Sequence, residues 1–202
     1  SLCFLLQVNL GVPVLNYFIT SREAGLYAAG SSLLQAVDFL TISLLTTLLP
    51  KVSQLTGLEA CRSYVRRSFP VYAALAACLV PILFFARPIV LMLFGPAYEG
   101  TIPVFQILFL GALGTLVTHP LYLVLYTMNR PHLYTVTGIV ALIGWVVVGF
   151  WMIPNQGAIG AAWTTLFARL LQSVLILAVL WRALEFGQSD GLFTRSIMTD
   201  QR

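Results

Sequence analysis

The chain has 202 residues, of which 59% are hydrophobic and 9% are charged, and its formal net charge is +4 at pH 7. A soluble domain of this length does not need so much apolar surface, and the mean hydropathy of +0.91 therefore predicts a membrane protein. The basic residues stand at the ends of apolar runs and form no single patch, which argues against nucleic acid as a partner. The three cysteines have neither metal-ligand spacing nor a disulfide rhythm, so we assign them no chemistry.

Six apolar stretches are long enough to cross a bilayer, because about 20 helical residues, each rising about 1.5 Å, match the hydrocarbon thickness. In chain order they cover about residues 2–20, 28–50, 68–86, 101–128, 133–153 and 157–181. Between the second and the third, residues 57–67 are too few to cross, and their spacing is typical of an interfacial helix. We predict an all-α, polytopic membrane protein with a six-helix transmembrane lobe over residues 1–183 and a polar tail over residues 184–202.

The loops between these stretches alternate in their content of basic residues. One set of loops holds eight of them and the other set holds two, while Arg169 stands within a stretch. The eight are Lys51, Arg62, Arg66, Arg67, Arg130, Arg182, Arg195 and Arg202, and the two are Arg22 and Arg87. Because cytoplasmic loops carry an excess of Lys and Arg, this asymmetry predicts that both ends of the chain lie in the cytoplasm.

The second stretch carries a carboxylate, Asp38, close to its middle. A charge at the centre of a transmembrane helix costs about 2.5–3.5 kcal/mol on insertion scales, so it normally faces a partner or a water-filled cavity. Helical spacing places Ser31, Gln35 and Asp38 on one face, while leucines cover the rest. We expect this face to be turned toward protein or water.

The sixth stretch carries a second charge, Arg169, at a similar depth, and Arg169 shares a face with Thr165 and Gln172. Three interpretations are open: an ion pair with Asp38, a hydrophilic cavity lined by both charges, or a lipid-facing arginine that reaches the interface. Because Arg offers a planar fork of donors suited to phosphate, our hypothesis is that Arg169 lines a substrate pathway and holds an anionic group. The candidate substrate-cavity residues are therefore Gln35, Asp38, Arg169 and Gln172.

His119, beside Pro120 in the fourth stretch, is either a proton relay or a histidine that is hydrogen-bonded inside the helix bundle. The sequence shows no paired carboxylates, no Ser-His-Asp arrangement that local spacing supports and no metal-ligand cluster. We therefore expect neither an enzyme nor a bound cofactor or metal.

Three stretches of the sequence carry a family resemblance. They read EAGLYAAGSSLLQAVDFLTISLLTTLLPKVSQL from Glu23, IVLMLFGPAYEGTIPVFQILFLG from Ile89 and IPNQGAIGAAWTT from Ile153. In this order and spacing they resemble polysaccharide flippases of the multidrug/oligosaccharidyl-lipid/polysaccharide superfamily, and the resemblance covers nearly the whole chain. None of the three motifs identifies the sugar.

The resemblance implies a transporter of two six-helix lobes around a central cavity, in which this chain is similar to the C-terminal lobe. Such a protein would lie in the bacterial or archaeal cell membrane. It would turn lipid-linked oligosaccharide from the inner to the outer leaflet for cell-surface polysaccharide synthesis. The partners implied are lipid-linked oligosaccharide, membrane lipids and an N-terminal lobe of the same chain.

Three other functions remain open. A cation-coupled multidrug exporter of the same superfamily should carry several carboxylates within its helices, and the predicted spans offer Asp38 alone. A membrane-embedded polymerase or ligase should have a large outward loop, and every predicted outward loop is short. A scaffold of a polysaccharide assembly complex that transports nothing is separated from a flippase only by a measurement of activity.

Overall fold

The computed structural model describes residues 12–17, 19–52, 58–127 and 131–199. Within these ranges nearly every residue is helical and none lies in a β-strand, which confirms the predicted all-α class. After a short helix over residues 12–17, the elements are α2 (Ser21–Val52), α3 (Leu58–Leu79), α4 (Pro81–Phe84), α5 (Ala86–Phe94), the 3-10 helix η1 (Pro96–Tyr98), α6 (Thr101–Thr127) and α7 (Pro131–Thr199).

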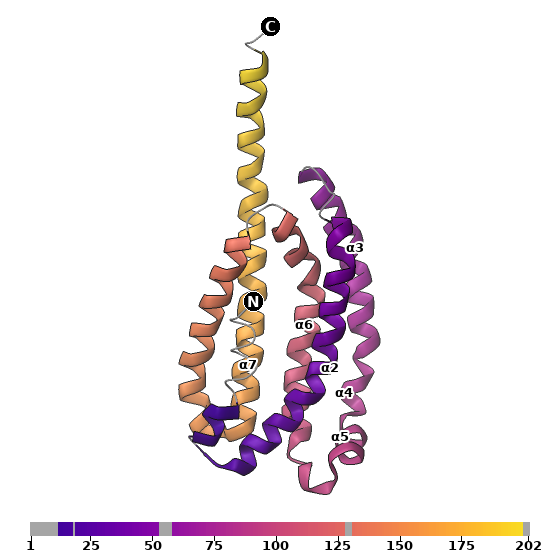
Figure 1. The fold of residues 1–202 in the computed structure, drawn as a ribbon, viewed down its shortest axis with the longest axis vertical. Helices are drawn as coiled ribbons and strands as arrows, with labels where there is room; N and C mark the ends of the chain where they lie inside the picture. Colours follow the sequence, from indigo (N-terminus) through magenta and orange to yellow (C-terminus); the bar gives the residue numbers. More distant parts are fainter. Residues whose placement is uncertain (1–11, 18, 53–57, 128–130, 200–202) are drawn as a thin grey trace.

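Among the described residues, three helical segments are long and apolar enough to cross a membrane. They are Ser63–Phe84, Thr101–Tyr122 and Leu133–Leu180. The last segment belongs to α7, which reverses its direction at Gly157 (Figure 1). We call residues 131–156 the first arm of α7 and residues 158–199 the second arm. The two arms lie side by side and correspond to the predicted spans 133–153 and 157–181.

Gly157 and Glu23 together form the junction between the two arms. Gly157 has φ 60° and ψ −134°, a backbone conformation that is open almost only to glycine. The N–H of the next residue, Ala158, donates a hydrogen bond of 2.9 Å to Oε2 of Glu23. The first N–H groups of a helix have no partner within it and carry partial positive charge, so the Glu23 carboxylate from α2 caps the second arm.

Helix α2 begins at Ser21, whereas the predicted second span begins at residue 28. The reason is local. The hydroxyl oxygen of Thr20 accepts a hydrogen bond from the N–H of Glu23 at 3.4 Å, and a Thr followed three residues later by a Glu is a capping-box pattern that starts a helix. Arg22, predicted to lie in a loop, therefore belongs to the first turn of α2.

The third span and the tail also differ from the prediction. Helix α3 is continuous from Leu58 to Leu79, so residues 58–67 belong to this helix and form no separate interfacial helix. The segment that is long and apolar enough to cross a membrane ends at Phe84 instead of residue 86. The second arm of α7 runs on to Thr199 through the predicted polar tail 184–202, because polar residues lower hydropathy without ending a helix. Most of the predicted first span, residues 2–11, lies outside the described residues.

Helix α6 lies between α7 on one side and α2 and α3 on the other (Figure 1). One cluster joins α6 to α2 and to both arms of α7 through Tyr27, Leu34, Val104, Leu108, Ala112, Trp145, Ala161 and Ala162. The other joins α6 to α3 and α5 through Tyr72, Ala76, Ala86, Phe105, Phe109, Leu113 and Leu116. The core is therefore centred on α6, and any polar group between α2 and α7 lies in apolar surroundings.

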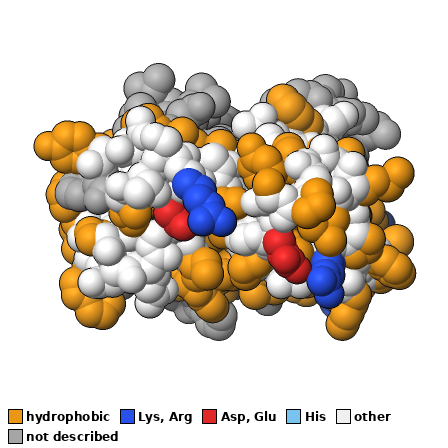
Figure 2. Space-filling model, turned by 90° about the horizontal axis from the view of Figure 1, so that it is seen from below, with side chains coloured by type: hydrophobic (Ala, Val, Ile, Leu, Met, Phe, Trp, Pro, Cys, Tyr) orange, Lys and Arg blue, Asp and Glu red, His pale blue; other side chains and the backbone are white. Residues whose placement is uncertain are grey.

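The outer surface is also largely apolar. The second arm presents an exposed stripe of Ile159, Trp163, Phe167, Leu170, Val174 and Leu177, spaced three or four residues apart. Such a stripe opposite a buried face is what a helix in contact with lipid requires. Figure 2 views the end where α2 begins, and hydrophobic side chains there surround two groups of oppositely charged ones. One ion pair at this end is Arg87 with Glu99, 3.1 Å apart and exposed.

Replacement of Gly157 by alanine should destabilise the protein by about 1–3 kcal/mol, because alanine strains the backbone at φ 60°. Its Cβ would also stand 2.7 Å from Glu23 Oε2. The measurement is the free energy of unfolding in mixed detergent micelles. Gly25→Ala is the matched control, since Gly25 lies within α2 with nothing within 4 Å of an added Cβ. Equal stability of the two variants would contradict the role of Gly157.

Candidate functional site

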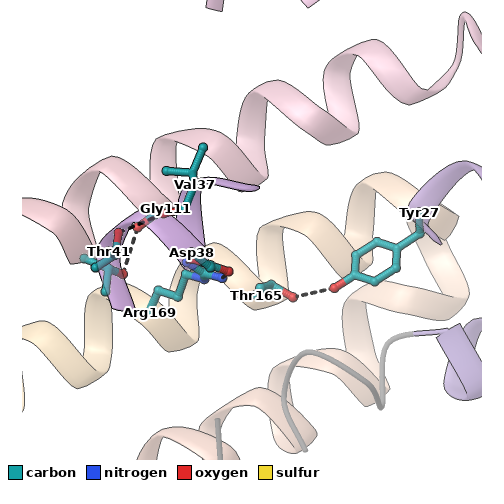
Figure 3. Close-up of polar contacts among 8 residues, drawn as sticks. Tyr27, Val37, Asp38, Thr41, Gly111, Thr165 and Arg169 are labelled. Atoms are coloured by element: carbon teal, nitrogen blue, oxygen red, sulfur yellow. Dashed lines mark hydrogen bonds and ion pairs between the residues drawn. The ribbon is translucent and has the colours of Figure 1, made fainter. Parts of the chain in front are cut away.

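Asp38 of α2 and Arg169 of the second arm form a bidentate ion pair. Nη1 of Arg169 donates to Oδ1 of Asp38 at 3.0 Å, and Nη2 donates to Oδ2 at 2.8 Å. The side chain of Arg169 is 5% exposed and that of Asp38 is 14% exposed. Figure 3 shows the guanidinium of Arg169 directed at the Asp38 carboxylate. Of the three interpretations of the two charges, the structure shows the ion pair and excludes a lipid-facing Arg169.

A third helix closes around this pair. A Cβ built on Gly111 of α6 would lie 3.3 Å from Cδ of Arg169 and 3.2 Å from Cδ1 of Leu166. Glycine at this position therefore lets α6 approach the second arm closely and pack along the arginine stem. One turn further along α2 from the pair, the hydroxyl of Thr41 donates to the carbonyl of Val37 at 3.0 Å, so this hydroxyl is satisfied within its own helix.

The hydroxyl of Thr165 on the second arm contacts both α2 and the first arm of α7. The hydroxyl oxygens of Tyr27 and Thr165 lie 3.0 Å apart in a buried hydrogen bond, which Figure 3 also shows. Trp145 of the first arm donates its Nε1–H to the same Thr165 oxygen at 3.2 Å. Together with the Glu23 contact at Ala158, these bonds form a polar seam. We use this name for the three contacts Glu23–Ala158, Tyr27–Thr165 and Asp38–Arg169.

The sequence analysis missed Glu23, Tyr27 and Trp145 as members of this site. A signal for two of them was present. Ala158, Thr165 and Arg169 are spaced by seven and four residues, and Glu23, Tyr27 and Asp38 also share one face of α2. Two matching polar faces on long apolar helices predict that the helices pack against each other. No local pattern indicated Trp145, because its contact with Thr165 depends on the reversal at Gly157.

The other candidate residues lie in different surroundings. Gln172 is 7% exposed and lies on the second arm three residues beyond Arg169, whereas Gln35 is exposed on α2. His119 of α6 is 6% exposed, and its ring centroid lies 5.8 Å from that of Tyr72 and 6.0 Å from that of Tyr122. Of the predicted cavity residues, the structure thus brings Asp38 and Arg169 into contact and leaves Gln35 at the surface.

A short hydrogen-bonded chain connects α6 to the ion pair. The hydroxyl oxygens of Thr118 and Ser173 lie 3.2 Å apart, and the hydroxyl of Ser173 donates to the backbone carbonyl of Arg169 at 2.9 Å. Because Thr118 precedes His119 on α6, the two neighbours face different helices: Thr118 meets α7, and His119 meets α3. The arrangement supplies a buried cation held by a carboxylate, together with hydroxyl and amide groups on the same arm.

Comparison with known proteins gives no relative: no protein family, no curated protein and no solved structure matches the chain.

Breaking one side of the ion pair should cost about 3–5 kcal/mol, because the other charge stays buried without its partner. We expect this loss for Asp38→Asn and for Arg169→Met in the free energy of unfolding. The double variant Asp38→Leu/Arg169→Met should recover much of it, since apolar packing can replace a buried pair.

Arg87→Met is the matched control for the ion-pair variants. It breaks the ion pair between Arg87, which is 70% exposed, and Glu99, which is 63% exposed. Exposed ion pairs of this kind contribute about 0–1 kcal/mol to stability. A loss in Arg169→Met no larger than in Arg87→Met would show that the buried pair does not hold α2 to α7.

Proposed function

We propose that the chain is one six-helix lobe of a transporter that turns lipid-linked oligosaccharide from the inner to the outer leaflet of a cell membrane. The observation that carries the proposal is the buried, bidentate Asp38–Arg169 pair between helices that are otherwise apolar. Ionised groups within membrane helices are rare and mark substrate or ion pathways. The pair lies in a helix bundle whose outer surface is largely apolar. Three segments of this bundle are long and apolar enough to cross a membrane.

The geometry of the pair suits exchange with a phosphate. A guanidinium binds a carboxylate and a phosphate through the same pair of parallel N–H groups. The phosphate of a lipid-linked sugar can therefore take the place of the Asp38 carboxylate on Arg169 without a change in the donor arrangement. Asp38 keeps Arg169 paired when no substrate is bound, and Gln35 and Gln172 provide amide groups for sugar hydroxyls.

The proposed lobe has the topology that the basic residues predict. The six spans cross the membrane with both ends in the cytoplasm, and an N-terminal lobe of the same chain supplies the opposite wall of the cavity. Rocking of the two lobes exposes the cavity to one leaflet and then to the other. A polar lining replaces the water that the sugar headgroup loses on entering the membrane.

The test is leaflet-resolved labelling of lipid-linked oligosaccharide in cells depleted of the intact protein. Depletion should leave the substrate on the cytoplasmic face, and the intact protein should restore its export. Arg169→Ala should reduce the export rate about tenfold or more, because a hydrogen bond to a charged group contributes about 1.5–3 kcal/mol. Arg169→Lys should recover only part of the rate, since an ammonium cannot bind two oxygens in parallel.

Two comparisons separate transport from stability. Asp38→Leu/Arg169→Met should fold stably and still fail to export, whereas Arg87→Met should export normally. Normal export by the double variant would reject Arg169 as an anion site, while the proposed flippase function would still stand. An unchanged leaflet distribution after depletion would reject the flippase itself and favour the multidrug exporter or the non-transporting scaffold.

Loss of a pH-dependent rate in His119→Ala would support the predicted proton relay.

A further inference from the structure

The interface between α3 and α6 holds buried polar atoms that the polar seam does not include. Tyr72 of α3 is 4% exposed, His119 of α6 is 6% exposed, and their ring centroids are 5.8 Å apart. Among the described residues, none hydrogen-bonds to the hydroxyl of Tyr72 or to Nε2 of His119. The buried hydroxyl of Tyr64, two helical turns away on α3, also has no partner there. Tyr64 packs on a neighbouring cluster of Leu121, Tyr122, Ile176 and Leu180, whereas Tyr72 and His119 lie in one interface and need a common explanation.

Leaving a donor or an acceptor buried without a partner costs about 1–3 kcal/mol for each group, and more where hydrocarbon surrounds the helices. A hydrogen-bonding ligand at this place removes that cost. The hydroxyl of Tyr72 both donates and accepts, and a neutral imidazole nitrogen does one or the other. A neutral molecule that donates and accepts satisfies both, whereas the apolar neighbours Phe109, Leu113 and Leu116 offer an ion no countercharge.

Pro120 removes a backbone donor from α6 beside His119. Proline has no N–H, so the carbonyl of Leu116 loses the donor that a regular helix would supply four residues later. Leu116 is fully buried and belongs to the cluster that faces α3. The imidazole of His119 stands in the same helical turn as this proline. A bound water normally makes two to four hydrogen bonds, and the Tyr72 hydroxyl and Nε2 of His119 are two buried groups that need a partner.

We propose that Tyr72 and His119 form a hydration site between α3 and α6, in which bound water hydrogen-bonds to the Tyr72 hydroxyl and to Nε2 of His119. The site is separate from the Asp38–Arg169 pair and holds water whether or not the protein transports lipid-linked sugar.

The first test is the thermal stability of Tyr72→Phe in the intact protein in detergent or lipid nanodiscs. If water bonds to the hydroxyl, the substitution should lower Tm by about 2–4 °C, as the loss of one hydrogen bond does in a chain of this size. Tyr27→Phe is the matched control, because it removes a buried hydroxyl with a known partner, Thr165. A Tm that is unchanged or raised in Tyr72→Phe overturns the proposal, since the hydroxyl would then be unsatisfied and better removed.

The second test observes the water directly. Water-edited solid-state NMR of the protein labelled with ¹⁵N at histidine, in bilayers, should show magnetisation transfer from bound water to Nε2 of His119. The signal lost in His119→Gln assigns the resonance. If that variant does not fold, His132→Gln assigns it by elimination, because the chain has two histidines. Absence of transfer at Nε2 overturns the proposal, and transfer that Tyr72→Phe weakens confirms the shared site.

Discussion

The ion pair between Asp38 and Arg169 constrains how α2 can pack against the second arm of α7. Apolar contacts are non-directional, so apolar packing alone specifies the relative position of two helices only weakly. A buried bidentate pair has no such tolerance, since a shift of one turn would separate two charges in apolar surroundings. The pair therefore fixes the register of the two helices, and α6 packs along the stem of Arg169 at Gly111.

The opposite end of the seam is fixed by backbone geometry instead of charge pairing. Gly157 reverses the chain, and the reversal presents the N–H of Ala158 to the carboxylate of Glu23. The contact satisfies a donor that the second arm cannot satisfy itself and places negative charge at the positive end of a long helix. The hydrogen bond between Tyr27 and Thr165 lies between these two ends of the polar seam. Both ends of the contact between α2 and the second arm are thus held by polar groups, and apolar packing fills the length between them.

Hydropathy and helical spacing predicted the elements of the fold better than their ends. The fourth span, residues 101–128, agrees with α6 to within one residue, because apolar composition and helix length coincide there. Composition and helix length do not coincide at α2, because the cap formed by Thr20 and Glu23 starts this helix at Ser21. They also differ in the second arm, which stays helical to Thr199 although its composition becomes polar. Asp38 and Arg169 were predictable as buried charges from their positions within apolar stretches. Trp145 was not, because its partner Thr165 lies across a chain reversal that only the tertiary structure creates.

Helix α6 connects the two polar regions of the bundle through adjacent residues. Successive residues on a helix point about 100° apart, so Thr118 reaches Ser173 on α7 while His119 reaches Tyr72 on α3. Pro120 follows directly and weakens the backbone ladder at this turn. The Ser173 hydroxyl also holds the carbonyl of Arg169, which ties the α7 side of this turn to the ion pair. The second arm of α7 therefore contacts α6 in the turn that contains Pro120, where the imidazole ring packs near the rings of Tyr72 and Tyr122.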